Sequence, residues 1–479
     1  MIERRVGPGL LGMASIAVCL MVLGGCMVGP DYRKPQADVP AKWAQMPEKG
    51  VGAGVEDISR WWTLFKDPVL DSLIDRAIRS NKDLKLAEAR IREARAQRGT
   101  VTPGLYPSVD VSGGYSRSRN STETASGGKA RGSGYDLFQA GFDASWELDI
   151  FGGVRRSIEA ADATIQSAEE SRRDVLVTLA AEVATNYLEV RGDQLRLAIS
   201  RQNLESMRKT LELTQAKFEA GLSSELNISQ QQAQLAATEA TVPAFESAEK
   251  QAIHQLGVLL GLKPEALLEE LSSPAPIPGI PPEVSVGIPS DLLRRRPDVR
   301  RTERELAAAT ARIGAATADL FPKFSLTGSL GQMSMDIRDI VSPGARFWSI
   351  GPSVTWPVFD AGKIRANIEI QNARQEQALV QYEKAVLASL KDVEDALVAY
   401  AKEQEVRRSL AQAVEATQRA FEISNELYSK GLVDFLNVLD SQRNLYLSQD
   451  KLAQTDQKVS NNLAVLFKAL GGGWEIPAQ

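Results

Sequence analysis

The chain contains almost no cysteine and almost no histidine: two and one, respectively, among 479 residues. Cys19 and Cys26 lie close together near the N-terminus, and a chain cleaved before Cys26 cannot form an internal disulfide. His254 is the only histidine, so the chain has too few histidines and cysteines for a classical catalytic triad or a Cys/His metal site. We therefore expect no catalytic residue, no enzyme activity, no metal and no dissociable cofactor. The net charge of −5 gives no reason to expect nucleic-acid binding.

Apolar runs long enough to cross a bilayer as a helix, about 20 residues, are also missing. The apolar run at residues 10–23 follows Arg4 and Arg5 and is typical of a signal peptide. It ends at Leu23-Gly24-Gly25-Cys26, which resembles the bacterial lipobox, although a chance cysteine beside an ordinary cleavage site would look the same. We expect a lipoprotein signal peptide at 1–25 and a palmitoylated Cys26. Any membrane crossing by the mature chain must then use strands.

Glycine and proline are nearly absent from two long stretches. Residues 363–430 contain neither, which allows a helix of about 68 residues, or roughly 100 Å at ~1.5 Å per residue. Residues 154–220 contain a single glycine. Both stretches end at a Gly-Leu pair, and their apolar residues recur at spacings of three and four, which predicts coiled-coil packing. We expect two long coiled-coil hairpins with tip turns at Gly221 and Gly431.

Strict alternation of polar and apolar residues predicts two strands before each long helix. The predicted strands are about 107–118, 137–149, 322–331 and 347–358. About ten alternating residues with aromatic side chains near the ends are typical of an outer-membrane barrel strand, although a half-buried strand of a soluble sheet alternates as well. Four acidic residues on the polar side are expected to face a lumen: Asp110, Asp143, Glu147 and Asp149.

Four strands per chain would leave two unpaired edges, which a lipid environment does not tolerate. The chain is therefore expected to associate with copies of itself. Two chains would supply about eight strands, whose interior side chains would largely fill the barrel. Three would supply about twelve strands, within the range that barrels use, and would leave a pore. We predict a homotrimer.

These patterns divide the chain into six segments. Pro243 lies inside the first of the two shorter helices and predicts a kink there. The predicted segments are a signal peptide (1–25), a lipid-anchored segment (26–80), structural repeat 1 (81–261, with helices at 154–220 and 225–261), a Pro-rich linker (262–297), structural repeat 2 (298–471, with helices at 363–430 and 434–470) and a tail (472–479).

Several short segments carry a family resemblance. They are Gly29-Pro30-Asp31-Tyr32, Arg295-Arg296-Pro297-Asp298-Val299-Arg300, Asp319-Leu320-Phe321-Pro322, Trp146-Glu147-Leu148-Asp149-Ile150-Phe151-Gly152, Trp356-Pro357-Val358-Phe359-Asp360-Ala361-Gly362 and Ala469-Leu470-Gly471-Gly472-Gly473-Trp474. In these residues the chain resembles the TolC-like outer membrane efflux factors, in particular their lipoprotein branch of the NodT/OprM type. The resemblance implies a mostly α fold with a membrane β-barrel. In that arrangement three chains form a twelve-stranded β-barrel in the outer membrane and an α-barrel in the periplasm.

The resemblance also implies partners and a gate. The partners are a periplasmic adaptor (membrane fusion) protein and an inner-membrane pump, usually of the resistance-nodulation-division class. The gate lies at the second tip, at positions matching Tyr428, Leu436 and Asp440, and Phe435 is a second apolar candidate. Three Asp440 carboxylates around a narrow lumen would repel one another and hold cations. Alternatively, Asp440 is a solvated helix residue paired with Arg443.

We therefore expect a lipid-anchored outer membrane channel of a tripartite efflux system, extending into the periplasm and passively conducting small solutes such as drugs. The exit duct of a type I protein-secretion system is the main alternative, because the fold alone does not separate the two. The lipoprotein anchor favours efflux. A structural coiled-coil lipoprotein bridging two membranes is a remote alternative, and the alternating strands argue against it.

Overall fold

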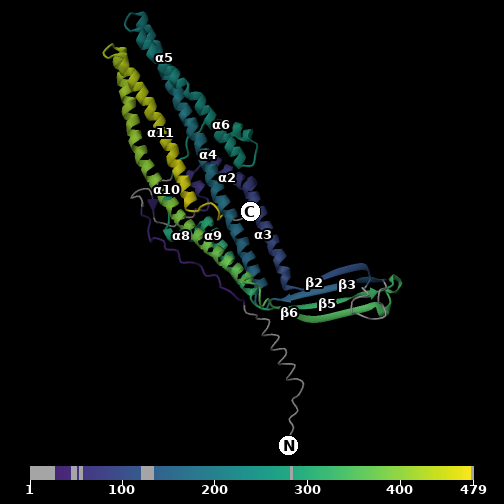
Figure 1. Ribbon diagram of the computed structural model, residues 1–479. Helices are drawn as coiled ribbons and strands as arrows, with labels where there is room; N and C mark the ends of the chain where they lie inside the picture. Colours follow the sequence, from purple (N-terminus) through teal and green to yellow (C-terminus); the bar gives the residue numbers. More distant parts are fainter. Residues whose placement is uncertain (1–26, 45–50, 53–57, 120–133, 281–283, 476–479) are drawn as a thin grey trace. The chain divides into compact units, whose positions relative to one another are not determined.

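The computed structural model describes residues 27–44, 51–52, 58–119, 134–280 and 284–475 (Figure 1). The predicted signal peptide and Cys26 lie outside the described residues. The chain forms two compact units, each assembled from both repeats. The first consists of Met1–Pro35, Ile91–Ala168 and Thr302–Tyr382, and the second of Gln36–Arg90, Glu169–Arg301 and Glu383–Gln479.

A four-stranded antiparallel sheet belongs to the first unit. Its order is β2-β3-β5-β6, with β2 at Ser108–Arg119, β3 at Gly134–Leu148, β5 at Lys323–Ser334 and β6 at Arg346–Thr355 (Figure 1). The last strand was predicted to end at residue 358, but β6 ends at Thr355. After it the chain makes a tight turn, in which the Val358 N–H donates to the Trp356 carbonyl. Pro357, between them, has no N–H to give to a ladder.

Four helices occupy the predicted long and pre-strand positions. They are α3 (Lys82–Val101), α4 (Gly153–Glu219), α9 (Pro297–Ala318) and α10 (Lys363–Ser429). Among the described residues, none of the helices is both long enough and apolar enough to span a membrane.

The two shorter partner helices differ from each other. The second is the single helix α11, Phe435–Ala469. The first is not one helix over 225–261 but two, α5 (Glu225–Glu239) and α6 (Thr241–Leu259). Pro243 has no N–H to donate to the Glu239 carbonyl, and α5 ends at that residue.

Short elements fill the flanking segments. The predicted linker at 262–297 contains short helical turns, because proline is well suited to the first position of a helix. These elements are β1 (Val51–Gly52), which pairs in parallel with β4 (Val284–Ser285), η1 (Trp61–Phe65), α2 (Pro68–Ser80), η2 (Thr102–Leu105), η3 (Pro264–Leu267), α7 (Leu268–Leu271), α8 (Pro289–Arg295), η4 (Ile337–Asp339) and η5 (Pro343–Ala345).

The main hydrophobic core lies in the second unit and contains apolar residues of both long helices. Val183 and Tyr187 of α4 and Val393 and Leu397 of α10 are fully buried in it. The N-terminal segment contributes as well, since Trp61 stacks on Phe467 of α11 with ring centroids 5.2 Å apart. The short elements around η1 therefore help to hold the helices together.

Candidate functional site: the two-faced sheet and the hairpin tips

One face of the sheet is apolar and exposed. The register aligns Val111, Phe142, Leu330 and Trp348 in a row across all four strands. More than half of each of these residues is exposed, and Ile350 and Val354 extend the patch on β6. Alternation places such a row on one side only, and exposed apolar patches of this extent mark contact with lipid or protein.

The opposite face is polar. In the neighbouring row Asp110 pairs in register with Asp143, followed by Ser329 and Ser349. The Ser329 and Ser349 hydroxyl oxygens lie 2.8 Å apart, and the Ser112 hydroxyl donates to Asp143 over 2.9 Å. The strands are thus linked by side-chain hydrogen bonds on a hydrophilic surface.

Three of the four predicted acidic residues lie on this polar face. Asp110 and Asp143 are cross-strand neighbours, and Glu147 lies four residues along the same strand as Asp143. All three are exposed. A hydrophilic face that carries several carboxylates suits the wall of an aqueous passage.

The prediction for Asp149 is wrong. This residue follows the last residue of β3, and its carboxylate accepts the backbone N–H groups of Val154 and Arg155, both at 3.0 Å. It also pairs with the Arg155 side chain at 3.1 Å. Asp149 therefore caps the start of α4, where an anion offsets the unpaired N–H groups and the helix dipole.

The second strand-to-helix junction contains a matching cap. Asp360 accepts the N–H groups of Gly362 at 2.9 Å and Ile364 at 2.8 Å. The bond from Ile364 in particular lowers the pKa of the Asp360 carboxyl. An aspartate shortly before each long helix therefore caps its first turn and fixes the direction in which the chain leaves the strand.

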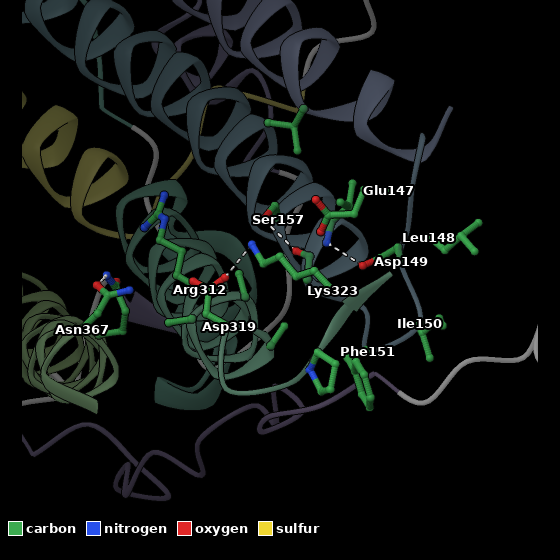
Figure 2. A pocket seen from close by; sticks show the side chains of 18 of the residues that line it. Glu147, Leu148, Asp149, Ile150, Phe151, Ser157, Arg312, Asp319, Lys323 and Asn367 are labelled. Carbon is green, nitrogen blue, oxygen red and sulfur yellow. Dashed lines mark hydrogen bonds and ion pairs between the residues drawn. The ribbon is translucent and has the colours of Figure 1, made fainter. Parts of the chain in front are cut away.

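A cavity of about 520 Å³ lies at the first junction (Figure 2). Glu147 comes from the end of β3 and Asp149 from the residues just after it. Arg312 and Asp319 come from the end of α9 and the turn after it, and Lys323 from the start of β5. Lys323 is paired with Asp319 at 3.0 Å. Within the described part of the chain, no group of three His, Cys, Asp or Glu side chains could hold a metal ion.

A strap formed by residues 28–35 lies on the first unit, and sequence reasoning missed how it is held. The Val28 N–H donates to the Phe151 carbonyl at 3.2 Å, and Arg156 binds Asp31 at 2.6 Å. Further along, the Tyr32 hydroxyl and the Lys34 ammonium both reach Glu303, each at 3.0 Å. The Gly29-Pro30-Asp31-Tyr32 motif was the available signal. The chain just after the predicted lipid site is thus fixed by specific contacts.

The tip turns of both hairpins lie at the predicted glycines. Gly221 and Gly431 have φ of +69° and +75°. In each turn the following leucine N–H reaches back to a helix carbonyl: Leu222 to Lys217 at 2.7 Å and Leu432 to Leu427 at 2.9 Å. This is the Schellman ending, which favours glycine because its residue adopts left-handed backbone angles.

Two of the four candidate gate residues are buried inside the second tip. Tyr428 and Phe435 pack edge to face with ring centroids 5.6 Å apart, and the Lys217 ammonium lies 4.4 Å from the Tyr428 ring centroid. They are packing residues of the tip. Their part in the gate stays a prediction.

The other two candidates are exposed. Leu436 is 62% exposed. The Asp440 carboxylate accepts from Arg443 at 2.8 Å and from Asn444 at 3.2 Å. This is the alternative arrangement that the sequence allowed, and it still leaves the carboxylate at the surface.

These features define a class of protein: long helical hairpins joined to a sheet with one lipid-compatible face and one hydrophilic face. Residues 73–262 and 288–472 match the family described as outer membrane efflux protein. The chain is 33% identical over 462 residues to nodulation protein T of Rhizobium leguminosarum bv. trifolii, covering 96% of this chain and 97% of that protein. The chain therefore belongs to the outer membrane efflux proteins.

Other relatives agree with this membership. The chain is 32% identical over 464 residues to the solvent efflux pump outer membrane protein SrpC of Pseudomonas putida, covering 95% of this chain and 97% of that protein. The solved outer-membrane channel OprN superimposes with a TM-score of 0.89 at 38% identity, covering 94% of this chain and 100% of that one. The resemblance of the sequence to the NodT/OprM type, the mostly α fold and the outer membrane location are thereby confirmed.

Proposed function

We propose that this protein is the exit duct of a tripartite efflux system, conducting small solutes passively from the periplasm across the outer membrane. It acts without catalysis and without a cofactor beyond the lipid on Cys26. The observation that carries the proposal is the two-faced sheet, whose apolar row suits lipid and whose acidic row suits an aqueous lumen. A periplasmic spacer would need neither face.

A homotrimer follows from the edges of the sheet. In the described chain β2 and β6 each pair on one side only, which leaves two open edges. Edges exposed in lipid carry unpaired N–H and C=O groups, and closing the sheet between copies satisfies them. Three copies supply twelve strands around a pore, whereas two would supply eight around a filled interior.

The partners are a periplasmic adaptor protein and an inner-membrane pump of the resistance-nodulation-division class. The support is indirect: SrpC is named as the outer membrane protein of a solvent efflux pump. A duct has no source of energy of its own, so a pump must drive export. Leu222 and Leu432, exposed at the two tips, offer apolar contacts to an adaptor.

The test is a deletion strain challenged with dyes, antibiotics, organic solvents and metal ions, compared with the strain complemented by the wild-type gene. Efflux predicts increased sensitivity to at least one class, restored by complementation. The second candidate function, the exit duct of type I protein secretion, predicts unchanged sensitivity and the loss of a protein from the culture medium. Unchanged sensitivity together with unchanged exported proteins would contradict both.

A further inference from the structure

The order of the sheet places two particular helices at its two edges. Helix α3 runs through the short η2 turn into β2, and α10 follows β6 (Figure 1). If the trimer of the proposed function closes by pairing β6 of one copy with β2 of the next, α3 of the second copy must lie beside α10 of the first. This inference rests on that trimer and asks which side chains meet.

Helix α3 has an unpartnered face of small residues and one cation. Its buried side is formed by Leu84, Ala87, Ile91 and Ala94. On a different side of the helix Arg92, Ala96 and Gly99 recur at spacings of four and three, and all three are exposed. Arg92 has no hydrogen-bond or ion-pair partner within the described chain, and a Cβ added at Gly99 would meet no atom within 4 Å.

Helix α10 has a matching face of small residues and carboxylates. Ala366, Glu369, Ala373, Glu376 and Val380 recur at spacings of three and four, and all are exposed. This is a heptad pattern, on a side of the helix other than the one that buries Tyr382. Within the described residues, Glu369 and Glu376 have no ion-pair partner.

The two faces also match in level. Helix α3 ends at Val101 and β2 begins at Ser108, while β6 ends at Thr355 and α10 begins at Lys363. Because these connections are nearly equal in length, residues equally far from the two helix ends lie at similar heights above the strands. Counting back from Val101 and forward from Lys363 places Arg92 between the levels of Glu369 and Glu376.

We propose that α3 of one copy and α10 of the next form an antiparallel seam. Arg92 lies between the Glu369 and Glu376 carboxylates of the neighbouring copy. By the same count Ala96 and Gly99 lie at the levels of residues 368 and 365, close to Ala366, and these small side chains let the two helix backbones approach closely. The charges are opposite and otherwise unpaired, so the seam selects a second copy of this chain and fixes its register.

Paired cysteines test the contact in the full-length protein in detergent. After cleavage the chain has no cysteine besides Cys26, which is expected to carry the lipid. Any disulfide that forms must therefore join the introduced cysteines. Ala96→Cys or Gly99→Cys, each combined with Ala366→Cys, should give covalent dimers and trimers on oxidation. The matched control is Gln97→Cys with Ala366→Cys, because Gln97 is exposed at the same level but on a different side of α3 and should give none.

Charge reversal supplies an independent measurement. Arg92→Glu should lower the temperature at which trimers dissociate, and adding Glu369→Arg and Glu376→Arg should restore it. Arg90→Glu should leave it unchanged. Failure of both cysteine pairs to cross-link, or of the reversed charges to restore stability, would refute the seam while wild-type trimers persist. Absence of wild-type trimers would instead refute the proposed duct.

Discussion

Buried charged side chains hold the N-terminal strap in place. The Arg156 side chain is only 3% exposed, and its guanidinium donates to the Val28 carbonyl at 3.1 Å and to Asp31 and Glu159 at 2.6 and 2.8 Å. A buried guanidinium is tolerated only when such partners replace water. The same logic applies to Glu303, whose side chain is 6% exposed and faces Lys34, Tyr32 and Arg304.

The strap should loosen in acid. Burial raises the pKa of Glu303, but hydrogen bonds from Lys34 and Arg304 outweigh it and hold the pKa below its usual range. A carboxyl with a depressed folded pKa stabilises above its unfolded value, about 4.3, and the stabilisation is lost as the pH falls through the folded value. The protection of the amides in residues 28–35, which is their exchange rate relative to that of the unstructured chain at the same pH, should therefore be constant near neutral pH and should fall only below about pH 4.3.

Glu303→Gln provides the control for this acid effect. The amide keeps an acceptor for Tyr32 but removes the charge that Lys34 and Arg304 face, so the strap should lose about 1–3 kcal/mol of local stability at neutral pH. The loss of amide protection near pH 4 should then disappear. An unchanged acid response in this variant would assign the effect to another carboxyl.

Asp440 is the charged candidate at the second tip. If three copies of its carboxylate surround a narrow passage, Asp440→Ala should raise single-channel conductance and lower the preference for cations in planar bilayers. Arg443→Ala, which removes the intrachain partner of Asp440, should instead strengthen that preference. Unchanged conductance and selectivity in both variants would remove Asp440 from the gate.

At the scale of elements, the hairpins depend on left-handed turns. Gly431 has φ of +75° and would have no atom within 4 Å of an added Cβ, so Gly431→Ala should act through backbone strain alone, costing about 1–2 kcal/mol. The expected result is faster hydrogen exchange in the last turn of α10 and the first turn of α11. Gly344→Ala, also in open space but without a positive φ, should have no such effect.

The pattern of the long elements could be predicted because it is local. Helical period, strand alternation and glycine turns are properties of neighbouring residues, and these patterns predicted α4, α10 and the polar side of β3. The exact ends of the helices and strands were harder to predict, because Pro243 and Pro357 each remove a backbone hydrogen bond near an element end. The use of Asp149 as a helix cap depends on where the chain goes after the strand.

At the scale of the whole molecule, the two faces of the sheet should respond oppositely to one charge. Trp348→Arg places a cation on the apolar face, where lipid would make it cost about 2–4 kcal/mol near the bilayer centre. Ser349→Arg, the next residue, places it on the polar face and should be tolerated. The yield of folded trimers in outer membrane fractions should fall only for Trp348→Arg, and equal yields would contradict a lipid-facing row.

The sequence by itself determined the repeat, the elements, the two faces of the sheet and the family, because periodicity and motifs act over short ranges. Tertiary structure alone decided that Tyr428 and Phe435 pack inside a tip, that Asp149 caps a helix and that Glu303 holds the strap. Each of these depends on which distant segment packs against a side chain. Burial and ion pairing are set by such long-range contacts and not by the neighbouring residues in the sequence.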